Sequence, residues 1–180
     1  MMLQQAGLTF DAASPNVDEA VEKRKHNDAA GLTETLAEKK ALAISRDRPG
    51  DWVIGSDSAV SIGVQIYDKP KDRDEAARHL REFSGNEMIL TSSVALAKSG
   101  QVDWSQSDSA ILSVRQLTEA FIQDYLDAEW PEVSYCVGVF RLEGRGVQLF
   151  DRIDGNYFTI LGMPLLPLLN ALRDRGVIAR

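Results

Sequence analysis

A carboxylate and a lysine fall at two turns of one short stretch, residues 53–70, whose sequence is VIGSDSAVSIGVQIYDKP. A short apolar run precedes Asp57, so we expect a strand to deliver this carboxylate to a turn. Lys69 follows on the next turn, which the ring of Pro70 stiffens. A strand end can hold a carboxylate and a cation rigidly on opposite sides of a small polar substrate. The stretch therefore predicts the edge of an active site.

Other common chemical motifs are missing from the sequence. It contains neither a GxxxxGKS/T phosphate loop nor a GxGxxG motif between a strand and a helix. His26 and His79 lie among charged residues, so we expect both on the surface, and Cys136 has no histidine partner that would make it a nucleophile. Carboxylates, lysines and hydroxyls must then do the chemistry. This set suits phosphoanhydride hydrolysis with Mg²⁺ or Mn²⁺, where oxygen ligands and substrate phosphates share the metal.

Charge and hydropathy exclude several classes of protein. The net charge of -7 argues against binding to nucleic-acid polymers, which takes a basic face. No apolar run approaches the roughly 18 to 20 residues that span a membrane. The first ten residues lack the basic start and apolar centre of a secretory signal. We therefore expect a cytoplasmic protein that binds neither nucleic-acid polymers nor membranes.

Helical and strand-like segments alternate along the 180 residues. Apolar spacing predicts helices over 32–44, 71–83, 117–126 and 164–175, and strands over 52–55, 59–66, 87–97, 107–114, 135–140 and 146–153. Asp28 or Thr33 is the expected cap of the first helix. Helices interspersed with hairpins predict an α/β fold with a mixed sheet, and no linker divides residues 1–180 into separate domains.

The ordered motifs resemble those of the Maf (septum-formation) family of nucleoside triphosphate pyrophosphatases. Besides the stretch at 53–70, the resemblance rests on Ser84-Gly85, on GNYF at 155–158 and on GMPL at 162–165, and it covers almost the whole chain. It implies a mixed twisted sheet flanked by helices, with two lobes around a cleft that takes a nucleoside triphosphate, as in inosine-triphosphate pyrophosphatases. It also implies a homodimer.

The same resemblance implies roles for individual residues. GSDS takes the place of the family's Gly-Ala-Asp-Thr, which makes Asp57 the general base or a metal ligand and places Ser58 at the substrate. Lys40 matches the family's Leu-Ala-x-x-Lys-Ala and Lys69 its Lys-Pro, both as phosphate ligands, and Glu19 is implied as a metal or water partner. The alternatives are a turn-capping aspartate, solvated lysines and an exposed acidic loop.

The segment 136–144 resembles the family branch linked to 7-methyl-GTP, which has Cys-Ala-Gly-x-Phe-Lys-x-Glu-Gly here. Glu143 stands where the branch acting on thymidine and uridine triphosphates has glutamine. A carboxylate can accept hydrogen bonds from the N1–H and N2–H edge of guanine, and N7-methylation makes N1–H a stronger donor. The alternative is that Arg141 and Glu143 project from one face of a strand and pair with each other in solvent.

One departure from the family lies at the start of the chain. Family members begin with a strand and a Ser-x-Ser-x-x-Arg stretch that contributes to phosphate binding, whereas residues 1–7 match the helix that follows it. The resemblance then implies either a truncated start or a natural variant with impaired catalysis. We expect a pyrophosphatase acting on modified nucleotides such as 7-methyl-GTP. The alternative is a catalytically impaired nucleotide-binding or interaction protein connected with cell division.

Overall fold

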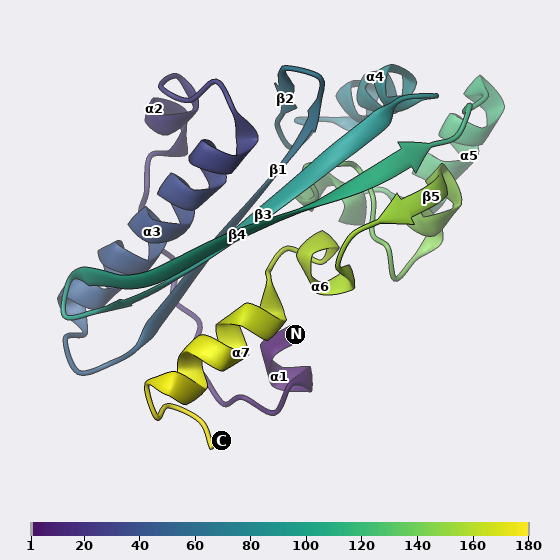
Figure 1. Ribbon diagram of the computed structural model, residues 1–180. Helices are drawn as coiled ribbons and strands as arrows, with labels where there is room; N and C mark the ends of the chain where they lie inside the picture. Colours follow the sequence, from purple (N-terminus) through teal and green to yellow (C-terminus); the bar gives the residue numbers. More distant parts are fainter. Residues whose placement is uncertain (1, 180) are drawn as a thin grey trace.

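A five-stranded sheet in the order β2-β1-β3-β4-β5 runs through the protein (Figure 1). The computed structural model describes residues 2–179. The strands are β1 (Val53–Ile62), β2 (Gln65–Tyr67), β3 (Glu87–Lys98), β4 (Gln101–Val114) and β5 (Phe150–Asp154). The predicted α/β class is confirmed, but all the described pairings are antiparallel, so the sheet is not mixed. Tight hairpins at Gly63 and at Ser99-Gly100, where the backbone has positive φ, turn the chain back on itself.

Seven α-helices and two short 3₁₀ helices are present among residues 2–179. They are α1 (Met2–Gln5), α2 (Glu19–Lys23), α3 (Ala29–Asp47), α4 (Arg73–Phe83), α5 (Glu119–Glu129), η1 (Glu132–Tyr135), η2 (Arg145–Leu149), α6 (Tyr157–Ile160) and α7 (Leu165–Asp174). The four predicted helices are confirmed as α3, α4, α5 and α7. Asp28 caps α3 by accepting a hydrogen bond from the Gly31 amide at 2.7 Å, so the helix begins three residues before the predicted start.

The two faces of the sheet differ in side-chain size. On one face, small residues such as Ala95 and Ala97 pack against Ala37 and Ala41 of α3. On the other face, Val94 and Leu96 pack against Leu168 and Leu172 of α7. Because successive residues of a strand point to opposite faces, β3 serves both layers. Small side chains on the α3 face let that helix lie close to the strands, which sets the geometry of the site described below.

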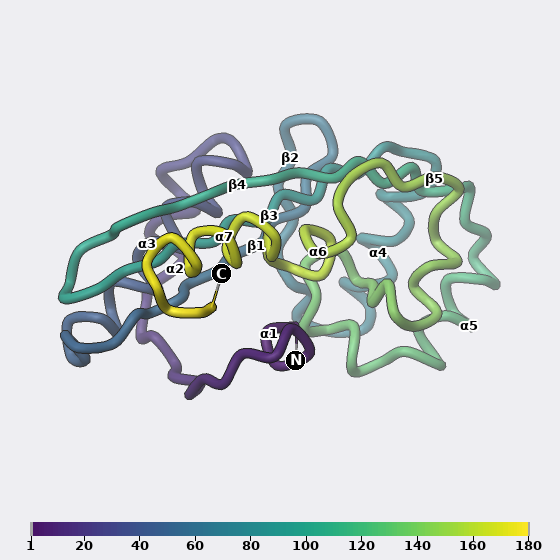
Figure 2. Tube along the Cα trace, turned by 60° about the horizontal axis from the view of Figure 1, so that its bottom comes forward, coloured from purple at the N-terminus to yellow at the C-terminus, as the bar shows by residue number. Residues whose placement is uncertain are grey.

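A second apolar core lies at the other end of the sheet, where α4 and α5 pack (Figure 1). It is built around Leu80 and Phe83 of α4 and Ile122 and Leu126 of α5, all buried against β3 and β4. The apolar cluster between the sheet and α7 also includes part of the N-terminal helix α1, which lies on the same side of the sheet as α7 (Figure 2). His79 is buried between Tyr67 and Phe83, so the predicted surface position of this histidine is wrong.

The segment after α5 also departs from the prediction. The predicted strand at 135–140 is absent from the structure, and of 146–153 only the part within β5 is a strand. Instead the chain loops back on itself: a Cβ on Gly146 would stand 2.5 Å from the Arg141 carbonyl oxygen, and Val139 has a φ of 55°. Arg141 and Glu143 therefore lie in a loop and not on one face of a strand.

No helix among residues 2–179 has the length and apolar character that crossing a membrane requires.

Candidate active site

A cavity of about 570 Å³ opens beside β1 and β2. It brings together all the site residues predicted from the sequence, namely Glu19, Lys40, Asp57, Ser58, Lys69, Arg141 and Glu143. Asp57 lies within β1, where it pairs with Ser93 of β3, so the turn predicted at this residue is wrong. The site residues come from α2, α3, β1, the turn after β2 and the loop that precedes η2. Their assembly is thus a product of the tertiary fold.

The cavity follows one edge of β1. Residues 60–62 of β1 pair with β2, whereas 53–59 pair with β3 alone among the described strands. Asp57 and Ser58 point to opposite faces of the sheet, yet both line the cavity, because it wraps around this edge. The unpaired edge also presents backbone N–H and C=O groups to whatever the cavity holds.

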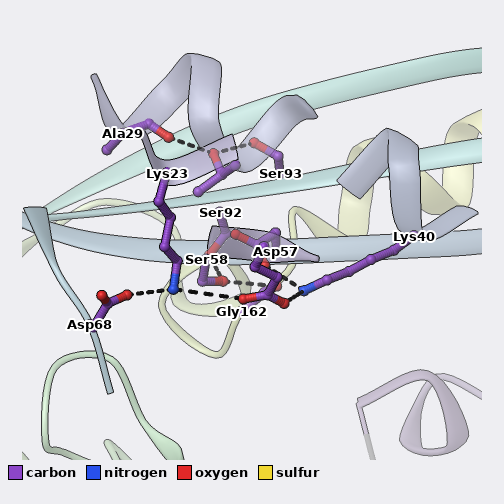
Figure 3. Close-up of polar contacts among 11 residues, drawn as sticks. Lys23, Ala29, Lys40, Asp57, Ser58, Asp68, Ser92, Ser93 and Gly162 are labelled. Atoms are coloured by element: carbon purple, nitrogen blue, oxygen red, sulfur yellow. Dashed lines mark hydrogen bonds and ion pairs between the residues drawn. The ribbon is translucent and has the colours of Figure 1, made fainter. Parts of the chain in front are cut away.

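Lys40 joins two carboxylates at the centre of the site (Figure 3). Its Nζ lies 2.6 Å from Asp57 Oδ1 and 2.7 Å from Glu19 Oε1. The reach of Lys40 depends on the close approach of α3 to β1, where a Cβ on Gly55 would stand 2.6 Å from the Ala41 amide nitrogen. Lys40 and Asp57 are both largely buried, with 20% and 11% of their side chains exposed, so solvent screens this pair weakly.

The two carboxylates differ in acidity. Burial raises the pKa of Asp57, and the hydrogen bond and charge of Lys40 offset this only in part. Burial also raises the pKa of Glu19, but the hydrogen bond and charge of Lys40, with the charges of Lys23 and Lys69, outweigh it and leave that pKa below its usual value. Environments that separate the pKa values of two neighbouring groups assign them different roles. Asp57 is the better proton acceptor, and Glu19 is the more persistent anion.

Ser58 lines the cavity, but its hydroxyl is engaged with the protein. Its Oγ lies 2.7 Å from Ser92 Oγ, to which it donates, and 3.4 Å from the Gly162 carbonyl oxygen. Ser92 in turn donates to the Thr159 carbonyl at 2.7 Å. These contacts tie β1 and β3 to the segment after α6, so Ser58 helps to build the wall of the cavity opposite Asp57.

The wall of the cavity that contains Arg141 and Glu143 also contains aromatic and apolar side chains. Tyr67, Tyr135, Val137 and Leu142 line it beside these two residues. Among residues 2–179 no ion pair joins Arg141 to Glu143. The two side chains are therefore not paired with each other as the alternative interpretation required.

Cys136 lines the same wall, half-buried. Burial and the charge of Glu143 raise the pKa of its thiol, which keeps it protonated. Cys136 thus contributes a protonated thiol to the wall.

Lys23 and Asp68 line the cavity as well, and sequence reasoning missed both. The Lys23 Nζ lies 2.5 Å from Asp68 Oδ1 and 3.8 Å from Glu19 Oε2. A signal for Lys23 was present, because it follows Glu19 by four residues and so shares its face of a helix. Its contact with Asp68, 45 residues away, has no local signal.

The site offers oxygen ligands to a metal ion. Among the described residues no group of three or more His, Cys, Asp or Glu side chains could hold one. Mg²⁺, however, usually binds one or two carboxylates, substrate phosphates and water. Glu19 and Asp57, whose oxygens both contact the Lys40 ammonium, fit that pattern once a cation or phosphate displaces the ammonium.

Comparisons with known proteins show the family of this chain. The family model described as "Maf-like protein" matches residues 1–175. The chain is similar to the "Nucleoside triphosphate pyrophosphatase" of Rhodopseudomonas palustris (strain BisB18), with 41% identity covering 99% of this chain and 90% of that protein. It is also similar to the "7-methyl-GTP pyrophosphatase" of Rhizobium meliloti (strain 1021), with 41% identity covering 98% and 91%, and to that of Rhizobium etli, with 42% identity covering 99% and 92%. The chain belongs to the Maf family.

Proposed function

We propose that this protein hydrolyses the bond between the α and β phosphates of nucleoside triphosphates, with 7-methyl-GTP as a preferred substrate. The observation that carries the proposal is the arrangement of Glu19, Lys40 and Asp57 in one cavity that also contains Lys23 and Lys69. It joins a proton acceptor to cations that suit phosphate oxygens. The names of similar proteins, nucleoside triphosphate pyrophosphatase and 7-methyl-GTP pyrophosphatase, support the same activity.

In the proposed reaction, Asp57 takes a proton from the attacking water. In the free protein Oδ1 of Asp57 is bonded to Lys40, which leaves Oδ2 to accept the proton. When Lys40 binds a phosphate oxygen instead, Oδ1 is released and can contact a metal ion. The water oxygen bonds to the α-phosphorus, and the bond from that phosphorus to the bridging oxygen breaks. Pyrophosphate leaves with the bonding electrons, and a nucleoside monophosphate remains. Lys40 and Lys69 stabilise the negative charge on the phosphate oxygens as it redistributes.

We propose Glu19 and Asp57 as the ligands of a Mg²⁺ or Mn²⁺ ion. When bound, such an ion neutralises phosphate charge and makes a bound water more acidic. The low pKa of Glu19 suits a ligand that must stay ionised near neutral pH.

We propose that Glu143 recognises the base. Glu143 lines the cavity together with the exposed Tyr135, whose ring provides a face against which a planar base can stack. A base made cationic by N7-methylation interacts more strongly with both a carboxylate and an aromatic face than a neutral pyrimidine does.

A nucleotide panel tests the proposal. Purified protein with Mg²⁺ or Mn²⁺ is expected to release pyrophosphate from 7-methyl-GTP faster than from GTP, UTP or TTP, and chelation of the metal is expected to stop the release. Nucleotide binding without pyrophosphate release from any member of the panel would contradict an enzymatic function. Unchanged release in excess chelator would contradict the metal.

A further inference from the structure

Lys23 differs from Lys40 in the kind of partner that holds it. Lys40 is bound to the two carboxylates at the centre of the site, whereas Lys23 is bound at 2.5 Å to Asp68 and lies 3.8 Å from Glu19. Asp68 lies on the side of the Lys23 ammonium that faces away from Lys40 (Figure 3). The Asp68 side chain is 67% exposed and that of Lys23 is 37% exposed. Exposed ion pairs are weak, because each partner is hydrated and salt screens the attraction. The contact is therefore one that a stronger anion can replace.

The cavity as a whole does not favour anions strongly. Its lining contains four acidic side chains, Glu19, Asp57, Asp68 and Glu143, and four basic ones, Lys23, Lys40, Lys69 and Arg141. A polyphosphate carries several negative charges, so its binding requires cations that are not already neutralised by the protein. If Asp68 releases Lys23, the ion pairs of Lys40 with Glu19 and Asp57 remain in place.

The helix that carries Lys23 can adjust at little cost. α2 buries only the side chain of Glu22, which is charged and pairs with Lys39 at 2.6 Å. Glu19 and Lys23 are its other attachments to the cavity, both through ion pairs. A small shift of Lys23 toward a ligand thus breaks no apolar packing within α2.

We propose that Lys23 is a phosphate-binding residue that Asp68 holds in the free protein and yields to the polyphosphate of the substrate. This inference rests on the proposed function and adds a competitor, Asp68, to the phosphate-binding machinery. It makes a prediction that a purely structural ion pair does not make: removal of the two partners affects ligand binding in opposite directions.

The test is the binding of inorganic tripolyphosphate, in the presence of Mg²⁺, to the full chain and three variants, measured by calorimetry at low ionic strength. Lys23→Gln removes a ligand and is expected to weaken binding about tenfold, the scale of one charge-assisted hydrogen bond. Asp68→Asn frees Lys23 and is expected to tighten binding about two- to fivefold. Lys25→Gln makes the same charge change next to α2 but outside the cavity lining, and is expected to leave binding within about twofold of the wild type.

Weaker binding in both Lys23→Gln and Asp68→Asn would show that the pair is structural and would overturn the proposal, as would wild-type binding in Lys23→Gln. Thermal unfolding of each variant checks that the site is folded. Because no turnover is needed, the result is separate from the test of the proposed function. A protein that releases no pyrophosphate yet shows the opposite shifts would contradict the activity and support the exchange of Lys23 between Asp68 and phosphate.

Discussion

At the scale of single residues, the site depends on a difference between two carboxylates that share one lysine. Asp57 is the more buried partner and has a raised pKa, and Glu19 has a lowered one. Lys40, bonded to both, has a pKa raised by these partners in spite of burial, so it stays charged. The charges of Lys23 and Lys69 also lower the pKa of Glu19, so Glu19 would have to lose them to become the better proton acceptor.

Asp57→Asn is expected to lower kcat at least about a hundredfold, because a positioned general base contributes that much or more. The proposed role of Asp57 requires the ionised carboxylate, so wild-type activity is expected to fall as the pH drops through the pKa of Asp57. Burial raises this pKa, so the acid limb lies above the ordinary value of 3.8. Initial rates across pH measure both effects, with the exposed Asp51→Asn as control. Wild-type turnover in Asp57→Asn would remove the assignment.

Glu143→Gln keeps the size of the side chain and removes its charge. It is expected to reduce discrimination in favour of 7-methyl-GTP over UTP by roughly 1 to 3 kcal/mol, the scale of a charge-assisted hydrogen bond. The ratio of kcat/KM values for the two nucleotides measures it, and Glu132→Gln, an exposed change outside the cavity lining, is the matched control. An equal ratio in Glu143→Gln and wild type would show that Glu143 does not recognise the base.

At the scale of elements, the contact of α3 with β1 holds Lys40 in reach of Glu19 and Asp57. Gly55→Ala would place a methyl group 2.6 Å from the Ala41 nitrogen and closer still to the Ala37 carbonyl, both backbone atoms of α3. The helix must move away, which is expected to cost roughly 1 to 3 kcal/mol of stability, as overpacking does. Because Lys40 moves with α3, kcat is expected to fall as well.

Denaturant unfolding and initial rates measure the effect of Gly55→Ala. Gly50→Ala is the control, since a Cβ there would meet no atom within 4 Å. Equal stability of Gly55→Ala and wild type would mean that α3 does not fix the position of Lys40 through this contact.

Elements with local signals were predictable from the sequence. Asp28 and the apolar spacing that follows it locate α3, and Ser99-Gly100 locates the turn between β3 and β4. The apolar alternation of residues 135–140 resembles a strand, but contacts made only in the folded chain, such as that of Gly146 with the Arg141 backbone, turn it into a loop. His79 was misplaced by its charged neighbours, although its spacing from Ala76 and Phe83 puts it on the buried face of α4.

The candidate site was predictable where motifs carry it. Asp57, Lys40 and Lys69 stand in recognisable short patterns, and the structure places all three in one cavity. The ion pair of Lys23 with Asp68 spans 45 residues and depends on how α2 lies over the turn after β2, which no local pattern specifies. The contact of Ser58 with Ser92 likewise depends on the register of β1 against β3, which no local pattern specifies.

At the scale of the whole molecule, the second core is closed by an ion pair between its two helices. Arg81 of α4 donates two hydrogen bonds to Glu119 of α5, at 2.6 and 2.8 Å. The pair lowers the pKa of Glu119 from 4.5 to about 2. A carboxyl whose pKa is lowered on folding stabilises the protein above its unfolded pKa, and the effect is lost as the pH falls through the folded value.

Glu119→Gln is therefore expected to lower Tm at neutral pH, and the difference from wild type is expected to shrink as the pH falls from about 4.5 to about 2. Both side chains are about half exposed, so added salt is expected to reduce the difference too. Thermal scans across pH measure it, with Asp124→Asn on the same helix as control. A Tm difference that does not change with pH would show that the ion pair is not its source.

The position at which water attacks is the most direct test of the proposed reaction. Hydrolysis of 7-methyl-GTP in ¹⁸O-labelled water, followed by mass spectrometry of the products, reports which phosphorus receives the water oxygen. Attack at the α-phosphorus predicts one labelled oxygen in the nucleoside monophosphate and unlabelled pyrophosphate. With Asp57 as the base, both products are expected to be lost in Asp57→Asn. Label in the pyrophosphate, or release of labelled orthophosphate and a nucleoside diphosphate, would contradict attack at the α-phosphorus.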